Sequence, residues 1–348
     1  MISYKNKKIC ICTVTYNSAE IFSQFISNYL HLIRSIKVDL CVLDNSQKKN
    51  VIEQNKKALA RLTKKMQVLS KEKLIIIPTR FSTNIFYFQS DHNCGGAGGF
   101  SKTTRFAVKE GYRLLWLLDD DCQFNEETLS ELLCCKEKNA ANTIVASLTV
   151  SKDNSTLSPP VTILKSTSTV PHLNLSSGNC TVAFETRSLP REDMFYSTGN
   201  FFNSILISDT IFKKIGFPDP LFFIWGDEND FLYRCWLRAV VVKVVKKSIV
   251  ITNNAENYKR FKVLSLQINL PLLSETKLYY MIRNSYFLNK KYNLVYLPLV
   301  RHFLLCLKYL IYEILSSSVQ KKPHRVELVI KAFWDGLMLV KTIPSYAQ

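Results

Sequence analysis

Zinc-site and familiar nucleotide-loop patterns are missing from this chain, which is also poor in histidine and glycine. Its 348 residues include five histidines and ten glycines. No two of the ten cysteines have CxxC spacing, so neither a zinc ribbon nor a disulfide framework is indicated, and a reducing cytosol fits best. Neither GxGxxG nor GxxxxGK[ST] occurs, which disfavours the common dinucleotide and P-loop sites. Four cysteines lie inside apolar segments and are predicted to be core residues: Cys10, Cys12, Cys41 and Cys306.

The sequence also shows no secretory-leader pattern and no apolar run that is a good candidate for a membrane-spanning helix. The opening MISYKNKKIC leads directly into an apolar run without a cleavage site, so we expect a cytoplasmic protein. The most apolar stretch, residues 294–315, is interrupted by Arg301, His302, Lys308 and Glu313. A spanning helix needs about 20 predominantly apolar residues. Two interpretations stay open: an amphipathic helix on the inner face of an anionic membrane, or a helical appendage packed on the rest of the chain or in a homo-oligomer.

The charge balance is strongly positive. Lys and Arg number 46 against 28 Asp and Glu, for a formal net charge of +18. This excess implies an anionic partner, such as a phosphorylated ligand or an anionic membrane surface. No basic stripe with interleaved aromatics stands out, so we expect no nucleic-acid partner.

Apolar runs of strand length alternate with segments of helical periodicity. Strands are expected at residues 9–15 and in KVDLCVLDNS, KLIIIP, IFYFQSDHN and YRLLWLL, and helices after Asn17, over 48–73, over 101–111 and from Glu126. Asn17 is expected to cap its helix. This alternation predicts an α/β domain on a mostly parallel sheet flanked by helices, over residues 1–270. Residues 151–191 are expected to form an insertion or mobile loop, and residues 271–348 a helical C-terminal region.

Polar residues stand at the end of each expected strand. Ligands of such sheets bind beyond the carboxyl ends of the strands. The residues at those ends carry hydroxyl, amide or carboxylate groups. They are Thr13, Tyr16, Asn17, Asp44, Asn45, Asn93 and residues 119–121. This convergence predicts a ligand site at one edge of the sheet.

The glycines are concentrated in NCGGAGGF, which holds Gly95, Gly96, Gly98 and Gly99. Such a loop lets backbone N–H groups cradle phosphate where a helix begins, although a flexible turn has the same composition. No Lys or Arg follows until Lys102, which disfavours a nucleotidyltransferase or phosphotransferase.

Three aspartates follow the apolar run YRLLWLL. If the strand continues, Asp119 and Asp121 share one side and Asp120 the other, and two carboxylates on one side suit Mg²⁺ or Mn²⁺. A solvated acidic turn is the alternative. The later segment IWGDENDFLYR places Asp227, Glu228 and Asp230 near Trp225. This segment fits two interpretations. One is an aromatic ring that stacks on a sugar beside a carboxylate that acts as general base, and the other is the acidic start of a helix.

In this order, TVTYN, LDNS, NCGGAGGF, LLDDD and WGDENDF resemble the family-two inverting glycosyltransferases of GT-A fold, a Rossmann-like fold. The resemblance is nearest to galactofuranosyltransferase- and rhamnosyltransferase-like members that build bacterial surface polysaccharides, and it spans roughly residues 9–285. It implies a GT-A domain with a helical appendage, a nucleotide-sugar donor, and a glycan or polyprenol-linked acceptor of the cell envelope.

The resemblance also implies roles for individual residues. Asp119 and Asp121 match the metal-binding DXD positions, and Glu228 the catalytic base. The donor nucleotide and sugar are implied to contact Thr13, Tyr16, Asn17, Asp44, Asn45, Asn93, Gly95, Gly96 and Asp120. Asp227 and Asp230 are implied to orient acceptor and donor hydroxyls, and Trp225 and Asp230 are expected to contact the acceptor. Asp227 is also expected to be catalytic, as the alternative to Glu228 for taking the proton of the attacking hydroxyl.

Two residues depart from the pattern of the resemblance. A histidine that serves as a further metal ligand usually follows the base by some two dozen residues, where this chain has Thr252. No histidine occurs between His172 and His302. The base is Glu where Asp is usual. UDP-galactofuranose is the favoured donor, with dTDP-rhamnose the alternative and a metal-dependent nucleotidyltransferase a more distant one.

Overall fold

The structure is a computed structural model that describes residues 8–62, 67–69, 74–152, 157–158, 161–164, 180–184, 194–197, 201–252, 258–263, 266–271, 273–292, 297–320 and 324–340. The chain divides into two compact units. Unit 1 comprises Met1–Leu221 and Phe231–Asn254, and unit 2 comprises Phe222–Asp230 and Ala255–Gln348. The predicted domain boundary at residue 270 stays a prediction.

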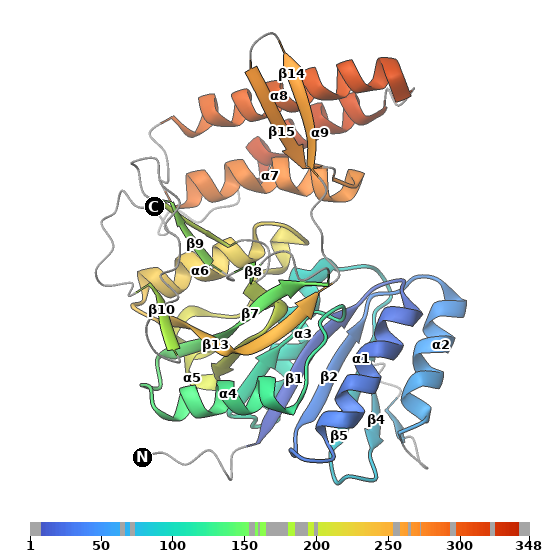
Figure 1. Cartoon of the computed structure of the whole chain (residues 1–348). Coiled ribbons are helices and arrows are strands. Elements are labelled where there is room, and N and C mark those ends of the chain that lie inside the picture. The colour runs from blue at the N-terminus through green and yellow to red at the C-terminus, as the bar shows by residue number, and fades with distance from the viewer. Residues whose placement is uncertain are drawn as a thin grey trace. The chain divides into compact units, whose positions relative to one another are not determined.

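Strands and helices alternate through the first half of unit 1, as the apolar runs predict (Figure 1). The elements in chain order are β1 (Ile9–Thr15), α1 (Ala19–Leu32), β2 (Asp39–Asp44), α2 (Lys49–Ala60), β3 (Gln67–Leu69), β4 (Leu74–Pro78), β5 (Asn84–Gln89), α3 (Gly95–Lys109), β6 (Leu114–Leu117), α4 (Glu126–Glu137), β7 (Thr143–Ser151), β8 (Leu157–Ser158), β9 (Val161–Leu164), β10 (Cys180–Phe184), β11 (Met194–Ser197), β12 (Ile205–Ser208), α5 (Asp209–Ile215) and β13 (Val241–Thr252).

Within the described residues, eleven strands form one sheet in the order β10-β13-β7-β12-β6-β1-β2-β5-β4-β3, with β8 beside β7. The pairs β1/β2, β1/β6, β2/β5 and β7/β13 are parallel. Strand β12 is antiparallel to both β6 and β7, so β7 and β13 still run in the direction of β6. The carboxyl ends of β1, β2, β5, β6, β7 and β13 therefore meet at one edge, which we call the carboxyl edge.

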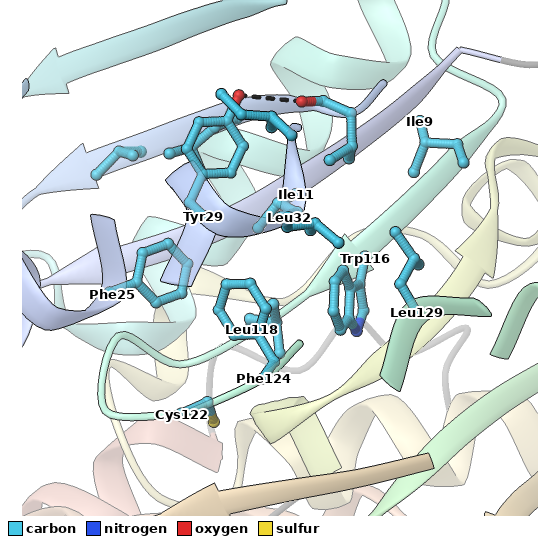
Figure 2. Packing of buried hydrophobic residues seen from close by; sticks show 14 of the residues in the cluster. Ile9, Ile11, Phe25, Tyr29, Leu32, Trp116, Leu118, Cys122, Phe124 and Leu129 are labelled. Atoms are coloured by element: carbon cyan, nitrogen blue, oxygen red, sulfur yellow. Dashed lines mark hydrogen bonds between the residues drawn. The ribbon is translucent and has the colours of Figure 1, made fainter. Parts of the chain in front are cut away.

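One face of the sheet packs against α1 and α4 through the cluster in Figure 2. Trp116 is fully buried there, in edge contact with Phe124 at 5.2 Å between ring centroids. The Trp116 indole N–H donates to Ser204 Oγ at 2.9 Å, which satisfies the one polar atom that burial would otherwise strand. The strand that leads to the aspartates is thus a fixed part of the core. The four cysteines expected in the core (Cys10, Cys12, Cys41 and Cys306) are buried.

Several local expectations were wrong. The segment 48–73 is not one helix, because α2 ends at Ala60 and β3 follows. The glycines of NCGGAGGF belong to the first turns of α3 and do not form a loop ahead of it. Residues 151–191 contain the last residue of β7, residue 152, β8, β9 and β10 and otherwise lie outside the described residues, so the expected insertion or mobile loop stays a prediction.

Helices dominate the C-terminal part, as predicted. They are α7 (Glu275–Lys291), α8 (Pro298–Gln320) and α9 (His324–Val340), preceded by a hairpin of β14 (Tyr258–Val263) and β15 (Leu266–Pro271). Residues of all three helices form the core of unit 2, including Ile282, Tyr309 and Val329. Helix α6 (Asp227–Leu237) has its first four residues in unit 2 and the rest in unit 1. No helix among the described ranges is both long and apolar enough to cross a membrane.

Candidate active site

The loops after β1 and β2 are tied to each other at the carboxyl edge. Asn17 N–H donates to Ser46 Oγ at 2.8 Å, and Asn17 Oδ1 accepts from Gln47 N–H at 3.1 Å. Asn17 has φ of 50° and precedes the N-cap of α1, which is Ser18. The expectation that Asn17 caps this helix was therefore wrong. Its side chain instead fixes one strand end against the next.

Thr13 and Tyr16, both predicted to contact the donor, differ in their surroundings. Thr13 is fully buried near the end of β1, and its hydroxyl has no hydrogen-bond partner in the protein. Tyr16 is half exposed at 50%. A buried hydroxyl without a partner costs free energy on the order of 1–3 kcal/mol. Thr13 is thus the kind of group that a ligand at this edge would satisfy.

Asp44 is fully buried and its carboxylate accepts three hydrogen bonds. Ser46 N–H donates to Oδ1 at 2.8 Å, while Asn55 Nδ2 and Tyr87 O–H donate to Oδ2 at 2.8 and 2.5 Å. Desolvation raises the pKa of the Tyr87 hydroxyl, and the Asp44 charge raises it further. Contact between Asp44 and a ribose stays a prediction.

Asn45 links the end of β2 to the start of α3. Its Nδ2 donates to Gly95 O at 2.9 Å, and its Oδ1 accepts from Cys94 N–H at 3.3 Å. Asn93 Oδ1 in turn accepts from Gly95 N–H at 2.9 Å. These amides hold the N-terminus of α3 at the carboxyl edge, where a helix start favours anions. The predicted roles of Asn45 and Asn93 toward the donor remain predictions.

The glycines of α3 serve packing as well as access. A Cβ on Gly99 would lie 2.4 Å from Val14 Cγ2, so helix and strand approach here more closely than any other residue allows. A Cβ on Gly96 would meet nothing within 4 Å. Gly96 therefore lies where backbone is open to approach, whereas Gly99 is needed for the fold itself.

The three aspartates lie in a turn, since β6 ends at Leu117 and Cys122 N–H donates to Asp119 O at 3.2 Å. Strand alternation therefore does not set the directions of Asp119 and Asp121, contrary to the sequence argument. All three residues are half-buried. Desolvation, together with the charges of Asp121 and Asp44, raises the pKa of Asp120 to about 7 against the opposing effect of the Thr15 hydroxyl.

This crowding fits a divalent cation. Carboxylate oxygens are the ligands that Mg²⁺ and Mn²⁺ prefer, and a cation would relieve the repulsion that raises the pKa of Asp120. In the part of the chain that the structure describes, no three His, Cys, Asp or Glu side chains form a metal-binding group. Gln123 and Ile251 exchange backbone hydrogen bonds of 2.8 and 3.1 Å, which brings the end of β13, with Thr252, beside the segment that follows the aspartates. Asn253, next along the chain, lies outside the described residues.

The second acidic segment follows an irregular loop in unit 2. Phe223, Trp225 and Gly226 have φ of 62°, 67° and 94°. A left-handed conformation costs a non-glycine residue about 1–2 kcal/mol. Asn284 of α7 donates through Nδ2 to the carbonyls of this loop, and the Phe223 ring stacks on Tyr280 at 4.4 Å. Contacts from α7 thus hold a backbone that local preference opposes.

Asp227, Glu228 and Asp230 form the first turn of α6. Asp230 is fully buried, and its Oδ1 accepts from Lys291 Nζ at 2.7 Å and from Tyr292 O–H at 2.6 Å. Desolvation raises the pKa of Asp227 well above its ordinary value, and the charges of Glu228 and Asp230 raise it further. Asp230 therefore braces α6 against the end of α7, and its predicted contact with the acceptor stays a prediction.

The sequence did not predict which residues position these side chains. Tyr87, Asn55 and Ser46 hold the end of β2, while Lys291 and Asn284 hold the second acidic segment. Only one signal pointed toward them. The segment 278–284, LYYMIRN, ends in Arg283 and Asn284 on an otherwise ordinary amphipathic helix.

Comparisons with known proteins agree on the class of protein. The model of the family described as "Glycosyl transferase family 2" matches residues 10–199. Galactofuranosyltransferase GlfT1 of Mycobacterium tuberculosis, from strains CDC 1551 and H37Rv, is 29% identical over 154 residues, or 44% of this chain. The match covers 46% of the length of that relative.

A solved structure shares the fold. Mannosyltransferase PcManGT from Pyrobaculum calidifontis, in complex with GDP-Man and Mn²⁺, superposes with a TM-score of 0.51 at 8% identity, covering 97% of this chain and 87% of its own. The mostly parallel sheet with helices on both faces is a GT-A fold with a helical C-terminal region, as predicted. With the family model matching more than half of its residues, this chain belongs to glycosyl transferase family 2.

Proposed function

We propose that this chain transfers a sugar, with inversion, from a UDP-linked donor to a hydroxyl of a growing bacterial surface glycan. The observation that carries the proposal is the row of polar side chains along the carboxyl edge, ending in residues 119–121, in a chain that the family model matches. The named activity of the mycobacterial relative favours galactofuranose as the sugar.

The donor is assigned to unit 1. Thr13, Tyr16 and Asp120 would contact the nucleotide sugar, with Gly95 and Gly96 at the helix start beside the diphosphate. Asp119 and Asp121 would hold Mg²⁺ or Mn²⁺, whose positive charge stabilises the departing nucleoside diphosphate. The solved mannosyltransferase, with its GDP-Man and Mn²⁺, supports this pairing of donor and metal.

The acceptor is assigned to the loop that holds Trp225 and to the first turn of α6. In a direct displacement, the acceptor oxygen bonds to the anomeric carbon as the bond to phosphate breaks, and the hydroxyl proton passes to the Glu228 carboxylate. Asp227 retains a proton to higher pH than an ordinary aspartate, so the adjacent pair carries less than two full charges. Trp225 would stack on the acceptor sugar.

The test is titration of the purified protein with UDP and dTDP, with and without Mn²⁺, followed by thermal shift and by UDP release from UDP-galactofuranose. Stabilisation by UDP that depends on Mn²⁺ supports the donor assignment. The same response to dTDP alone favours a rhamnosyltransferase. No response to either nucleotide contradicts the proposed site at residues 119–121.

We also propose that α8 binds the surface of an anionic membrane, where a lipid-linked acceptor would lie. Its exposed apolar side chains recur at helical spacing, at Val300, Phe303, Leu304, Leu307, Ile311 and Ile314. Arg301 and Lys308 are exposed among them, whereas Glu313 is buried against Arg325 at 2.8 Å. An apolar stripe with basic flanks suits an anionic lipid surface.

Vesicle co-sedimentation tests this second proposal. The double variant Phe303→Ser with Leu307→Ser is expected to lose at least tenfold in binding to vesicles of phosphatidylglycerol and phosphatidylcholine. Leu237→Ser, at an equally exposed position of unit 1, is the matched control and retains binding. Equal binding to purely zwitterionic vesicles contradicts the role of charge, and concentration-dependent dimerisation through the stripe contradicts the membrane assignment.

A further inference from the structure

The loop 222–226 leads directly into the acidic turn of α6. Asp230 N–H donates to Gly226 O at 2.8 Å, which is a first helical hydrogen bond of α6. The direction in which α6 starts, and with it the position of Glu228, therefore depends on the backbone of this loop. Because Phe223 and Trp225 both have left-handed φ, the loop needs contacts outside itself to keep its conformation.

Asn284 supplies those contacts from a fully buried position on α7. Its Nδ2 lies 2.9 Å from Phe222 O, 3.1 Å from Ile224 O and 2.5 Å from Trp225 O. The two N–H groups of the amide are thereby directed at three carbonyls of one short loop. Such a cluster around one side-chain nitrogen fixes several peptide planes at once.

The orientation of the Asn284 amide is fixed by its neighbour. Arg283 Nε–H donates to Asn284 Oδ1 at 2.8 Å, which requires the oxygen on that side and leaves the nitrogen facing the loop. The Arg283 guanidinium itself lies over the Tyr280 ring, 4.5 Å from its centroid. Tyr280 stacks on Phe223, so the same helical turn contacts the loop twice.

Gly226 completes the arrangement. A Cβ there would lie 3.0 Å from Leu288 Cδ1 and 3.4 Å from Asn284 Cβ, and its φ of 94° already excludes most side chains. A side chain at residue 226 would therefore push the loop away from α7. The contacts of α7 thus extend along the whole loop, from Phe222 to Gly226.

We propose that Asn284 is a positioning residue, which holds the loop 222–226 so that Glu228 meets the acceptor hydroxyl. The proposal rests on the function proposed for Glu228. It assigns to Asn284 a role in turnover and none in donor binding. If the Asn284 amide were merely structural, its replacement would lower stability without a loss of kcat separate from any loss of nucleotide affinity.

The test compares Asn284→Asp and Asn284→Ala with the matched control Ser285→Ala. Aspartate keeps the size of the side chain and the acceptor for Arg283 but replaces the N–H donors with an oxygen that repels the loop carbonyls. Ser285 is the next residue on α7, and its hydroxyl donates within the helix to Ile282 O at 2.8 Å. Arg283→Lys is a milder variant that keeps Asn284 and loosens its orientation, should the first two fail to fold.

Three quantities are measured on each folded variant. They are the steady-state rate of UDP release from UDP-galactofuranose, the UDP dissociation constant, and the hydrogen exchange of peptides that cover residues 222–232. We expect kcat to fall at least 100-fold in Asn284→Asp and Asn284→Ala and about tenfold in Arg283→Lys. The UDP dissociation constant should change less than twofold, and Ser285→Ala should match the wild type. Amide exchange should accelerate at least tenfold in 222–232 and stay unchanged in peptides from β1 and β6.

Unchanged exchange of the loop in Asn284→Asp overturns the proposal, as does faster exchange with unchanged kcat. Parallel losses of kcat and UDP affinity also overturn it, because they indicate general destabilisation. A wild type that releases no UDP from any donor contradicts the proposed function, and the exchange experiment then still decides whether Asn284 holds the loop.

Discussion

Residues 119–121 follow a strand in the middle of a parallel sheet, whereas residues 227, 228 and 230 begin a helix that a second helix braces. The first group emerges from a core in which Trp116 and Phe124 are fixed, and its neighbours are the ends of adjacent strands. The second group depends on an irregular loop and on side chains about 60 residues further along the chain. The difference teaches that regular structure can collect charges at one place, whereas aiming a single carboxylate takes individually placed contacts.

The two groups also balance charge differently. Asp230 has Lys291 at 2.7 Å, so part of the second group is neutralised within the protein. In the first group, the neighbouring charges of Asp121 and Asp44 add to the effect of desolvation on the pKa of Asp120. A site that gathers negative charge suits a cation and a diphosphate. A site that compensates its own charge suits proton transfer to one remaining carboxylate.

The largest expected effect comes from exchanging one acid in each group. Asp121→Asn and Glu228→Gln are each expected to lower transfer by about 10²–10⁴-fold, but for different reasons. Only Asp121→Asn should weaken UDP binding in the presence of Mn²⁺, since Glu228 is assigned to the acceptor. Isothermal titration with UDP and Mn²⁺ checks this. Equal nucleotide affinity in the two variants contradicts the division of roles.

Removing the internal counter-charge of the second group is expected to cost stability. Lys291→Met leaves the buried Asp230 without its cation and should lower the free energy of unfolding by about 3 kcal/mol. Lys213→Met is the control, because Lys213 is 67% exposed and lies 3.9 Å from Asp209. That change should cost less than about 1 kcal/mol. Urea unfolding measures both, and similar losses would show that Lys291 adds little to the brace.

Two glycines of α3 test how much the packing of helix on strand contributes to stability at the carboxyl edge. Gly99→Ala forces its Cβ against Val14 and should destabilise the protein by about 1–3 kcal/mol. Gly96→Ala has open space and should leave stability unchanged while weakening UDP binding, because the donor is proposed to approach there. Thermal unfolding and UDP titration of the two variants separate these effects. A stability loss in Gly96→Ala would contradict the assignment of that position to ligand approach.

The smallest effect is a pH dependence. Asp227 has a higher pKa in the folded protein than in the unfolded chain, so the folded state binds more protons above the unfolded pKa. The contribution of Asp227 to the free energy of unfolding is therefore fully present at low pH. It declines as pH rises from the pKa of the unfolded chain, near 4, to the raised pKa of the folded protein. Asp227→Asn should remove this decline. Unfolding free energies of wild type and variant across this range give the comparison, and parallel curves would show that Asp227 is not desolvated.

Regular apolar patterning made much of unit 1 predictable. The runs around Ile11, Val42 and Trp116 are buried on both faces, and a parallel sheet must end them at one edge, so the polar strand ends converge. The role of Asn17 could not be read, because its partners Ser46 and Gln47 become neighbours only when β2 pairs with β1. Gly99 resembled a loop residue because the sequence does not show that Val14 lies opposite.

Unit 2 was less accessible to such reasoning. The sequence predicted a helical C-terminal region, and the start of a helix was one of two interpretations of the segment that holds Asp227, Glu228 and Asp230. Left-handed φ at Phe223 and Trp225 has no local signal, because aromatic residues do not favour it. It follows from contacts with Tyr280 and Asn284, which are distant in sequence and become visible only in the folded chain.

The antiparallel strand β12 carries one more consequence. Strand β7 ends at Ser151 and β12 begins at Ile205, beside Leu117 of β6, so both ends of the intervening segment are anchored at the carboxyl edge. Within this segment, β8 and β10 return to the sheet beside β7 and β13. Doubling the length of a connection with fixed ends costs only about 0.6 kcal/mol of chain entropy. Natural lengthening of the connection between β8 and β10 would therefore leave the strands of the sheet in register, and related chains can acquire new surfaces beside residues 119–121 without rebuilding the sheet.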